Sequence, residues 1–189
     1  MAVIDSYYTY MYSKITINFF LILLFAMVQI SFIAGLPAGL NNFNLVLVVL
    51  VFILILTDLN LAAWWAIGLG FFLDIFSFSL FGINLLCLSA TAVIAYFLLN
   101  NFFTNRSLYS IAALVSLSTV FHEVFLALSL FLENFFLKLD ANSVFNAVFW
   151  SSKLSQLILN LIFSFVLFYL INFVSRKFKP AFLTKKVHS

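Results

Sequence analysis

Long apolar segments follow one another through most of this 189-residue chain, and very few charged residues interrupt them. Hydrophobic residues make up 66% of the sequence and charged residues 8%, whereas an average soluble domain is about a quarter charged. So few charges cannot cover the surface of a soluble fold that also contains 27 Phe residues. The chain is therefore predicted to be an integral membrane protein, and its function should lie in the few polar groups within the membrane.

The apolar segments predict six membrane-spanning helices, since one spanning helix needs about 20 apolar residues. The predicted spans cover residues 15–34, 43–57, 61–80, 82–99, 108 to about 137 and 144 to about 174. These runs are apolar on all faces, as expected for helices that contact lipid. The first run is longer than the apolar core of a cleaved signal peptide, so we expect it to be retained. No repeated alternation of apolar and polar residues indicates the strands of a membrane barrel.

The positions of Lys and Arg predict the orientation of the bundle. With six spans, Lys14, Arg106 and the five basic residues between 176 and 186 lie on one side. Only Lys138 lies on the other side, and Lys153 lies within a span. Positively charged loops favour the cytoplasm. The predicted fold is therefore an all-α membrane protein, a six-transmembrane-helix bundle with both termini cytoplasmic.

These predictions divide the chain into three parts. Residues 1–14 form a cytoplasmic N-terminal segment, residues 15–174 the six-helix transmembrane domain, and residues 175–189 a basic cytoplasmic tail. The tail is expected to rest on anionic lipid headgroups. The net charge of +3 is thus a topology signal, and the partner that it indicates is the lipid bilayer, not nucleic acid.

Five ionisable side chains fall within or near the predicted spans: Asp74, His122, Glu123, Glu133 and Lys153. A charge at the centre of the bilayer costs about 2.5–3.5 kcal/mol on insertion scales, so such groups should face the bundle interior and pair. At a rise of about 1.5 Å per residue, Asp74 lies roughly 9 Å below the outer end of its span. Lys153 lies roughly 9 Å, and Glu123 roughly 10 Å, below the likely outer boundary of the membrane.

This common depth predicts a pair between Glu123 and Lys153 that Asp74 could join. We favour an interhelical clamp as its role, while a ligand site open to the outside and a partner-binding site remain alternatives. His122 is not expected to share a face with its neighbour Glu123, and Glu133 is expected to be solvated. No second His or Cys lies near His122 in the sequence, so no metal site is predicted.

The third predicted span carries the densest pattern of small and polar residues, and the pattern continues into the next connection. Gly70 and Asp74 are four residues apart and share a helix face, and a glycine there lets a neighbouring helix approach closely. That helix would then shield the acid from lipid. Ser77 and Ser79 lie where the chain leaves the membrane, and Gly82 allows a sharp reversal into the fourth span.

No catalytic motif appears in the sequence: there is no Gly-x-Ser-x-Gly elbow, His-Glu-x-x-His helix or phosphate-binding glycine loop. The single Cys87 excludes a disulfide framework and is expected to pack as a small apolar residue. We therefore expect no catalytic residue, no cofactor and no metal. The residues singled out as structural or partner-binding candidates are Gly70, Asp74, Ser77, Ser79, Gly82, Glu123 and Lys153.

Residues 68–96 resemble the MreD family of rod-shape-determining membrane proteins. That family has a small residue, then three residues, an Asp, a Ser-containing turn, a Gly and an apolar helix. The resemblance extends more loosely to the short second span, the acid in the fifth span and the basic tail. The family often begins its second span with Pro followed by Asp or Asn, and here Phe43 and Asn44 stand in that place.

The resemblance implies a non-enzymatic membrane scaffold of the bacterial cell-wall elongation machinery, located in the cytoplasmic membrane. It implies direct binding to MreC, a single-span protein with a large extracytoplasmic domain. It also implies indirect work with the actin-like MreB, the glycosyltransferase RodA and a class B penicillin-binding protein.

The family is similar in architecture to the substrate-binding subunits of energy-coupling-factor vitamin transporters, which gives the alternative function. Such a subunit needs an outward cavity walled by aromatic and polar side chains, and Asp74, Glu123 and Lys153 would suit it. Trp64 and Trp65 are interpreted instead as interfacial anchors. The sequence shows no loop dedicated to a ligand, so the scaffold is favoured.

Overall fold

The computed structural model describes residues 2–37, 39–77, 80–103, 107–136 and 147–182. Of these residues, the side chains are described between 12 and 132 and between 150 and 173. Within these residues the secondary structure is helical, without strands. The helices are α1 (Ala2–Met27), a π-helical turn (Val28–Ile33), a 3₁₀ turn (Leu40–Asn42), α2 (Leu45–Leu56), α3 (Leu59–Phe76), α4 (Ile83–Asn101), α5 (Leu108–Phe136) and α6 (Ala147–Phe182).

Five of the helical segments described are long and apolar enough to cross a membrane, which confirms a helical, multi-pass membrane architecture. These five segments are Tyr12–Ile33, Leu59–Phe76, Ile83–Asn101, Leu108–Leu132 and Trp150–Phe173. The remaining helix, α2, has only twelve residues. Its length is about 18 Å, which is shorter than the hydrocarbon core of about 30 Å. The count of six spans therefore stays a prediction.

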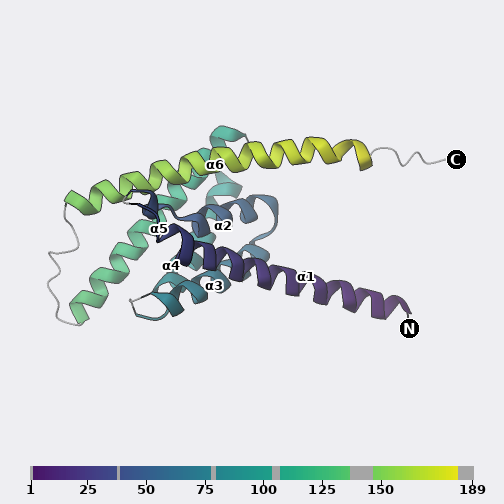
Figure 1. Cartoon of the computed structure of the whole chain (residues 1–189), viewed down its shortest axis with the longest axis horizontal. Coiled ribbons are helices and arrows are strands. Elements are labelled where there is room, and N and C mark those ends of the chain that lie inside the picture. The colour runs from purple at the N-terminus through teal and green to yellow at the C-terminus, as the bar shows by residue number, and fades with distance from the viewer. Residues whose placement is uncertain (1, 38, 78–79, 104–106, 137–146, 183–189) are drawn as a thin grey trace.

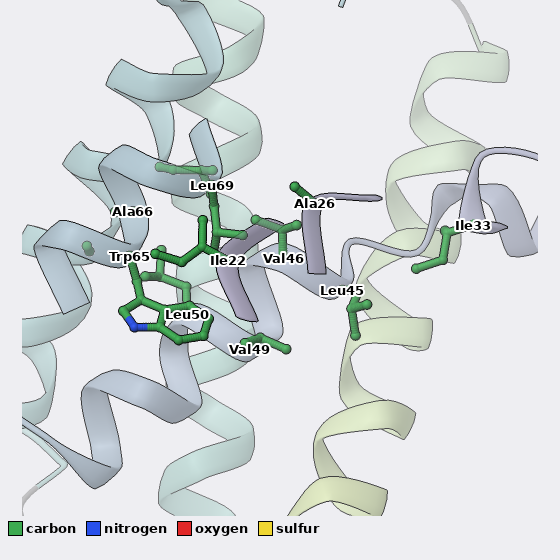
Figure 2. Packing of buried hydrophobic residues seen from close by; sticks show 12 residues of the cluster. Ile22, Ala26, Ile33, Leu45, Val46, Val49, Leu50, Trp65, Ala66 and Leu69 are labelled. Atoms are coloured by element: carbon green, nitrogen blue, oxygen red, sulfur yellow. The ribbon is translucent and has the colours of Figure 1, made fainter. Parts of the chain in front are cut away.

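Helix α2 lies in the middle of the bundle. Ten of its twelve residues are buried, and it contacts each of the other five α-helices that the structure describes. Figure 2 shows Leu45, Val46, Val49 and Leu50 of α2 gathered with side chains of α1 and α3. The expectation that every apolar run contacts lipid is wrong for α2. A helix that is apolar on all sides fits either lipid or the interior of a protein. Helix α2 has the second environment, because other helices surround it.

The peripheral helices bury much less of their surface. Only 11% of the most apolar stretch of α1 and 17% of that of α6 is buried within the protein. Trp64 is exposed on α3, as expected of an interfacial anchor, but Trp65 is buried and donates a hydrogen bond from Nε1 to Asn18 Oδ1 of α1 at 3.2 Å. The anchor interpretation of Trp65 is therefore wrong. Adjacent residues of a helix point about 100° apart, and here Trp64 faces outward while Trp65 faces α1.

The start of α2 is hydrogen-bonded to side chains that lie far apart in the sequence. The first N–H groups of a helix have no partner within it. Gln29, in the π-helical turn, accepts from Leu45 N at 2.8 Å and donates to Phe43 O at 3.0 Å. Asn160 of α6 accepts from Asn44 N at 3.1 Å, and the Asn44 side chain accepts from Leu47 N at 3.0 Å. Polar side chains thus replace water where α2 begins inside the bundle.

Figure 1 shows the start of α1 and the end of α6 at the same end of the long axis of the molecule. Helix α3 ends at Phe76, four residues earlier than the predicted span, because the chain turns there before α4. Helix α6 continues to Phe182, well beyond the predicted end of the last span. Gly82, with φ 102°, adopts the left-handed conformation that a reversal before α4 requires.

Replacing Asn160 tests the hydrogen bonds at the start of α2. Asn160 is fully buried and also donates to Thr119 Oγ1 at 3.1 Å. We expect Asn160→Ala to lower the free energy of unfolding in detergent by about 1–3 kcal/mol, because buried polar groups lose their partner. The matched control is Asn101→Ala, whose exposed side chain bonds only to Phe97 O within its own helix. Equal effects of the two substitutions would contradict this account.

Candidate functional site

Asp74, near the end of α3, is only 3% exposed and is hydrogen-bonded to the start of α4. Its Oδ1 accepts hydrogen bonds from Asn84 N at 2.9 Å and Asn84 Nδ2 at 3.0 Å, and its Oδ2 accepts from Leu85 N at 3.0 Å. The two backbone N–H groups belong to the second and third residues of α4. An N-cap side chain usually accepts hydrogen bonds from N–H groups at these positions. The N-cap residue here is Gly82, which has no side chain. Asp74 therefore caps α4 from the preceding helix, and its negative charge complements the positive end of the α4 dipole.

Gly70 allows α3 and α4 to meet backbone to backbone, one turn before Asp74. A Cβ atom at Gly70 would lie 2.4 Å from Leu85 Cα and 2.9 Å from Leu85 N. Only a residue without a side chain fits this contact. Ser77 follows the same turn, and its Oγ donates to Asp74 O at 3.2 Å. We call Gly70, Asp74 and Gly82, with the first turn of α4, the α3–α4 clasp; Ser79 lies outside the described residues.

A second polar cluster joins α5 to α6 around Glu123. Its Oε2 forms an ion pair with Lys153 Nζ, and its Oε1 accepts from Gln156 Nε2 at 2.7 Å. His122 Nδ1 lies 3.2 Å from the same Oε1. The structure thus brings Glu123 and Lys153 together, as the depth estimate predicts. Asp74 does not join them, because both of its carboxylate oxygens are used at the start of α4.

His122 and Glu123 point to different sides of α5, as expected for adjacent residues, yet their side chains are in contact. Their Cα–Cβ bonds point about 100° apart on the helix. The Glu side chain is long, however, and it bends toward Nδ1, the ring nitrogen nearer to the backbone. His122 is buried, so this contact keeps its polar ring within the bundle. The side chain of Glu133, the other acid of this helix, lies outside the described residues.

Sequence reasoning missed three uncharged members of the α5–α6 contact: Thr119, Gln156 and Asn160. Thr119 lies four residues before Glu123, and Asn160 lies four residues after Gln156. Residues four apart share a helix face, so this spacing could have placed each pair on one side of its helix. Together with Glu123, these three side chains form a polar seam between α5 and α6. In it Asn160 donates to Thr119, and Gln156 donates to Glu123.

A groove of about 460 Å³ lies between α5 and α6 beside this seam. Glu123 and Lys153 line it, together with mostly apolar neighbours that include Leu128, Phe131 and Trp150. Figure 1 shows α5 and α6 diverging toward the ends that the chain connects at residues 137–146. The volume falls within the range of small-molecule sites, about 300–1,000 Å³. The groove is therefore large enough for a ligand or for side chains of a neighbouring helix.

Several helices that can cross the membrane, packed around a buried central helix, define a multi-pass helical membrane protein. The family model described as rod shape-determining protein MreD matches residues 8–178, nearly the whole chain. The chain therefore belongs to the MreD family of rod shape-determining proteins, which confirms the resemblance of its sequence. The matched region includes both the α3–α4 clasp and the Glu123 cluster. Comparison with curated proteins and with solved structures gave no match.

The α3–α4 clasp predicts different effects for two glycines of the same helix. Gly70→Ala places a methyl group against the Leu85 backbone, so we expect the free energy of unfolding to fall by about 1–3 kcal/mol, as for overpacked cores. Gly68→Ala meets only the Ile22 side chain, at 3.1 Å, and its helix propensity improves by up to about 1 kcal/mol. We expect Gly68→Ala to stay close to wild type in thermal unfolding in detergent. The reverse order would contradict the clasp.

The ion pair predicts coupling between Glu123 and Lys153. We expect Glu123→Gln and Lys153→Met each to lower stability in detergent, and Lys153→Met to cost less, because Glu123 keeps its contacts with His122 and Gln156. The double variant should be more stable than the sum of the two effects predicts, by about 0.5–3 kcal/mol. Chemical unfolding of the four proteins measures this coupling. Strictly additive effects would show that the pair contributes nothing to stability.

Proposed function

We propose that this chain is a non-enzymatic scaffold of the bacterial cell-wall elongation machinery, located in the cytoplasmic membrane, and that it binds MreC directly. Through MreC it would act with the actin-like MreB, the glycosyltransferase RodA and a class B penicillin-binding protein. The observation that carries this proposal is the match of the family model to residues 8–178. Rod-shape determination requires assembly, and the soluble connections described here are short, so the helices themselves would bind partners.

The use of buried polar side chains supports a scaffold. Gln29 and Asn160 satisfy the backbone at the start of α2, and Asp74 satisfies the start of α4. Glu123 pairs with Lys153 and Gln156 between α5 and α6. These side chains fix the positions of the helices. This supports the role of interhelical clamp that the sequence favours. A bundle held in this way offers partners surfaces of constant shape.

The proposal includes the orientation of the bundle. Residues 15–174 would form a six-helix membrane domain, with α2 as a short central helix, and residues 1–14 and 175–189 would be cytoplasmic. The shared position of the start of α1 and the end of α6 in Figure 1 supports an even number of crossings. The concentration of Lys and Arg on the predicted cytoplasmic side supports the same orientation.

The alternative of a vitamin-binding subunit is supported by one observation, the groove between α5 and α6. Its volume suits a small ligand, and Lys153 and Glu123 offer polar contacts within it. Its other walls, however, are largely aliphatic and aromatic, which suits apolar surfaces better than a polar vitamin. The scaffold therefore remains the favoured function, and one experiment separates the two.

That experiment is purification of the tagged full chain, co-expressed with the full-length MreC of the same genome, in mild detergent. We expect MreC to co-purify in near-equimolar amounts, and no small molecule to be extracted in comparable amount by mass spectrometry. The control is an unrelated single-span protein with the same tag, which should not co-purify. A tightly bound vitamin without MreC would refute the scaffold and support the transporter subunit.

A further inference from the structure

The groove between α5 and α6 exposes large apolar side chains on both of its walls. Val124 and Leu128 of α5, and Trp150 and Leu154 of α6, line it and are each more than half exposed. Ala127, also in the lining, lies four residues after Glu123 and so shares its face of α5. A small residue at that position allows another backbone to come close. The groove therefore presents an apolar surface with room for close contact.

The Glu123–Lys153 pair belongs to the wall of this groove and is not sealed within the bundle. Of the Lys153 side chain 25% is exposed, and of the Glu123 side chain 13%, and both residues line the groove. Acyl chains offer no hydrogen bonds to these atoms, and polar groups exposed to hydrocarbon are costly. An occupant that carries a hydrogen-bonding group at this level is therefore favoured over acyl chains alone.

The depth of the pair distinguishes a helix from a lipid headgroup. Glu123 lies nine residues, or about 13 Å, before Leu132, and α5 continues to Phe136. Leu128 and Phe131 line the groove between Glu123 and that end. A lipid headgroup stays near the interface, beyond these apolar side chains. A membrane-spanning helix can place a polar side chain at any depth, so it can reach the pair.

The shape of the lining also favours an elongated occupant. On α5 the lining extends from Thr119 to Phe131, a length of about 18 Å along the helix. Because Glu123 and Lys153 already neutralise each other, a third charge at this place would be unbalanced. An uncharged side chain that both donates and accepts, such as Ser, Thr, Asn or Gln, can bond to the two groups together.

We propose that the groove between α5 and α6 binds the single membrane-spanning helix of a partner, which places one uncharged hydrogen-bonding side chain against Glu123 and Lys153. This inference rests on the proposed scaffold function and adds the surface and the chemistry of recognition. The aliphatic walls receive the apolar face of the partner helix, and Ala127 allows its backbone to approach. The ion pair then sets the position of that helix along the groove.

Site-specific photo-cross-linking tests this proposal in the full chain, co-expressed with the full-length MreC of the same genome. A cross-linking residue at Leu128 or Leu154 should label the MreC span. The same residue at Leu24, on α1, should not label it, although Leu24 is as exposed as Leu128, at 52% against 53%. Each Ser, Thr, Asn or Gln of the MreC span is replaced in turn by Leu, and at one position this should reduce cross-linking about threefold to tenfold, the range for one interhelical hydrogen bond.

The possible outcomes separate the two proposals. If MreC co-purifies but is labelled from Leu24 and not from Leu128 or Leu154, the groove is not the binding surface, and the scaffold function stands. Labelling of a second copy of this chain or of lipid alone from the groove positions would likewise overturn the inference. If wild-type MreC does not co-purify at all, both proposals fail. Lys153→Met, which keeps an apolar stem, should reduce groove labelling while a folded bundle elutes normally in size-exclusion chromatography.

Discussion

Two helices of this bundle begin at buried positions, and the N–H groups of their first turns must be satisfied by side chains from other segments. Gln29 and Asn160, which are far apart in the sequence, converge on the start of α2. Asp74 reaches the start of α4 from the preceding helix. Without these contacts a short central helix would expose backbone groups to an apolar interior, at a cost that no lipid contact offsets. The rest of the bundle is arranged around α2, so its position depends on them.

The polar seam between α5 and α6 follows one pair of helix faces. Asn160 and Thr119 lie deep in the bundle and support α2. One turn away, Gln156 and Lys153 of α6 contact Glu123 of α5, and Glu123 and Lys153 line the groove. The charged end of the seam borders the groove that we propose as the binding surface. In this proposal, internal support and recognition of a partner use adjacent turns of the same helices.

The sequence predicted a large part of this architecture, and the errors have physical causes. The Gly70–Asp74 spacing, the reversal at Gly82 and the Glu123–Lys153 pair follow from helical periodicity and depth, which can be counted along a chain. The partner of Asp74 could not be counted in that way, because it is the backbone of the next helix and not a charge. The burial of Trp65 could not be predicted, because it depends on which helix packs beside it. Gln156 and Asn160 carry no charge, so they do not stand out within an apolar span as ionisable groups do.

By itself the sequence determined that this is a helical membrane protein of the MreD family, because apolar composition, run length and a local glycine–aspartate motif do not depend on how helices meet. Only the tertiary structure decided that α2 occupies the centre of the bundle. A run that is apolar on all sides satisfies lipid and protein surroundings equally well, so the composition of its twelve residues does not choose between them. The choice comes from Gln29 and Asn160, whose hydrogen bonds to the start of α2 exist only after distant helices have packed together.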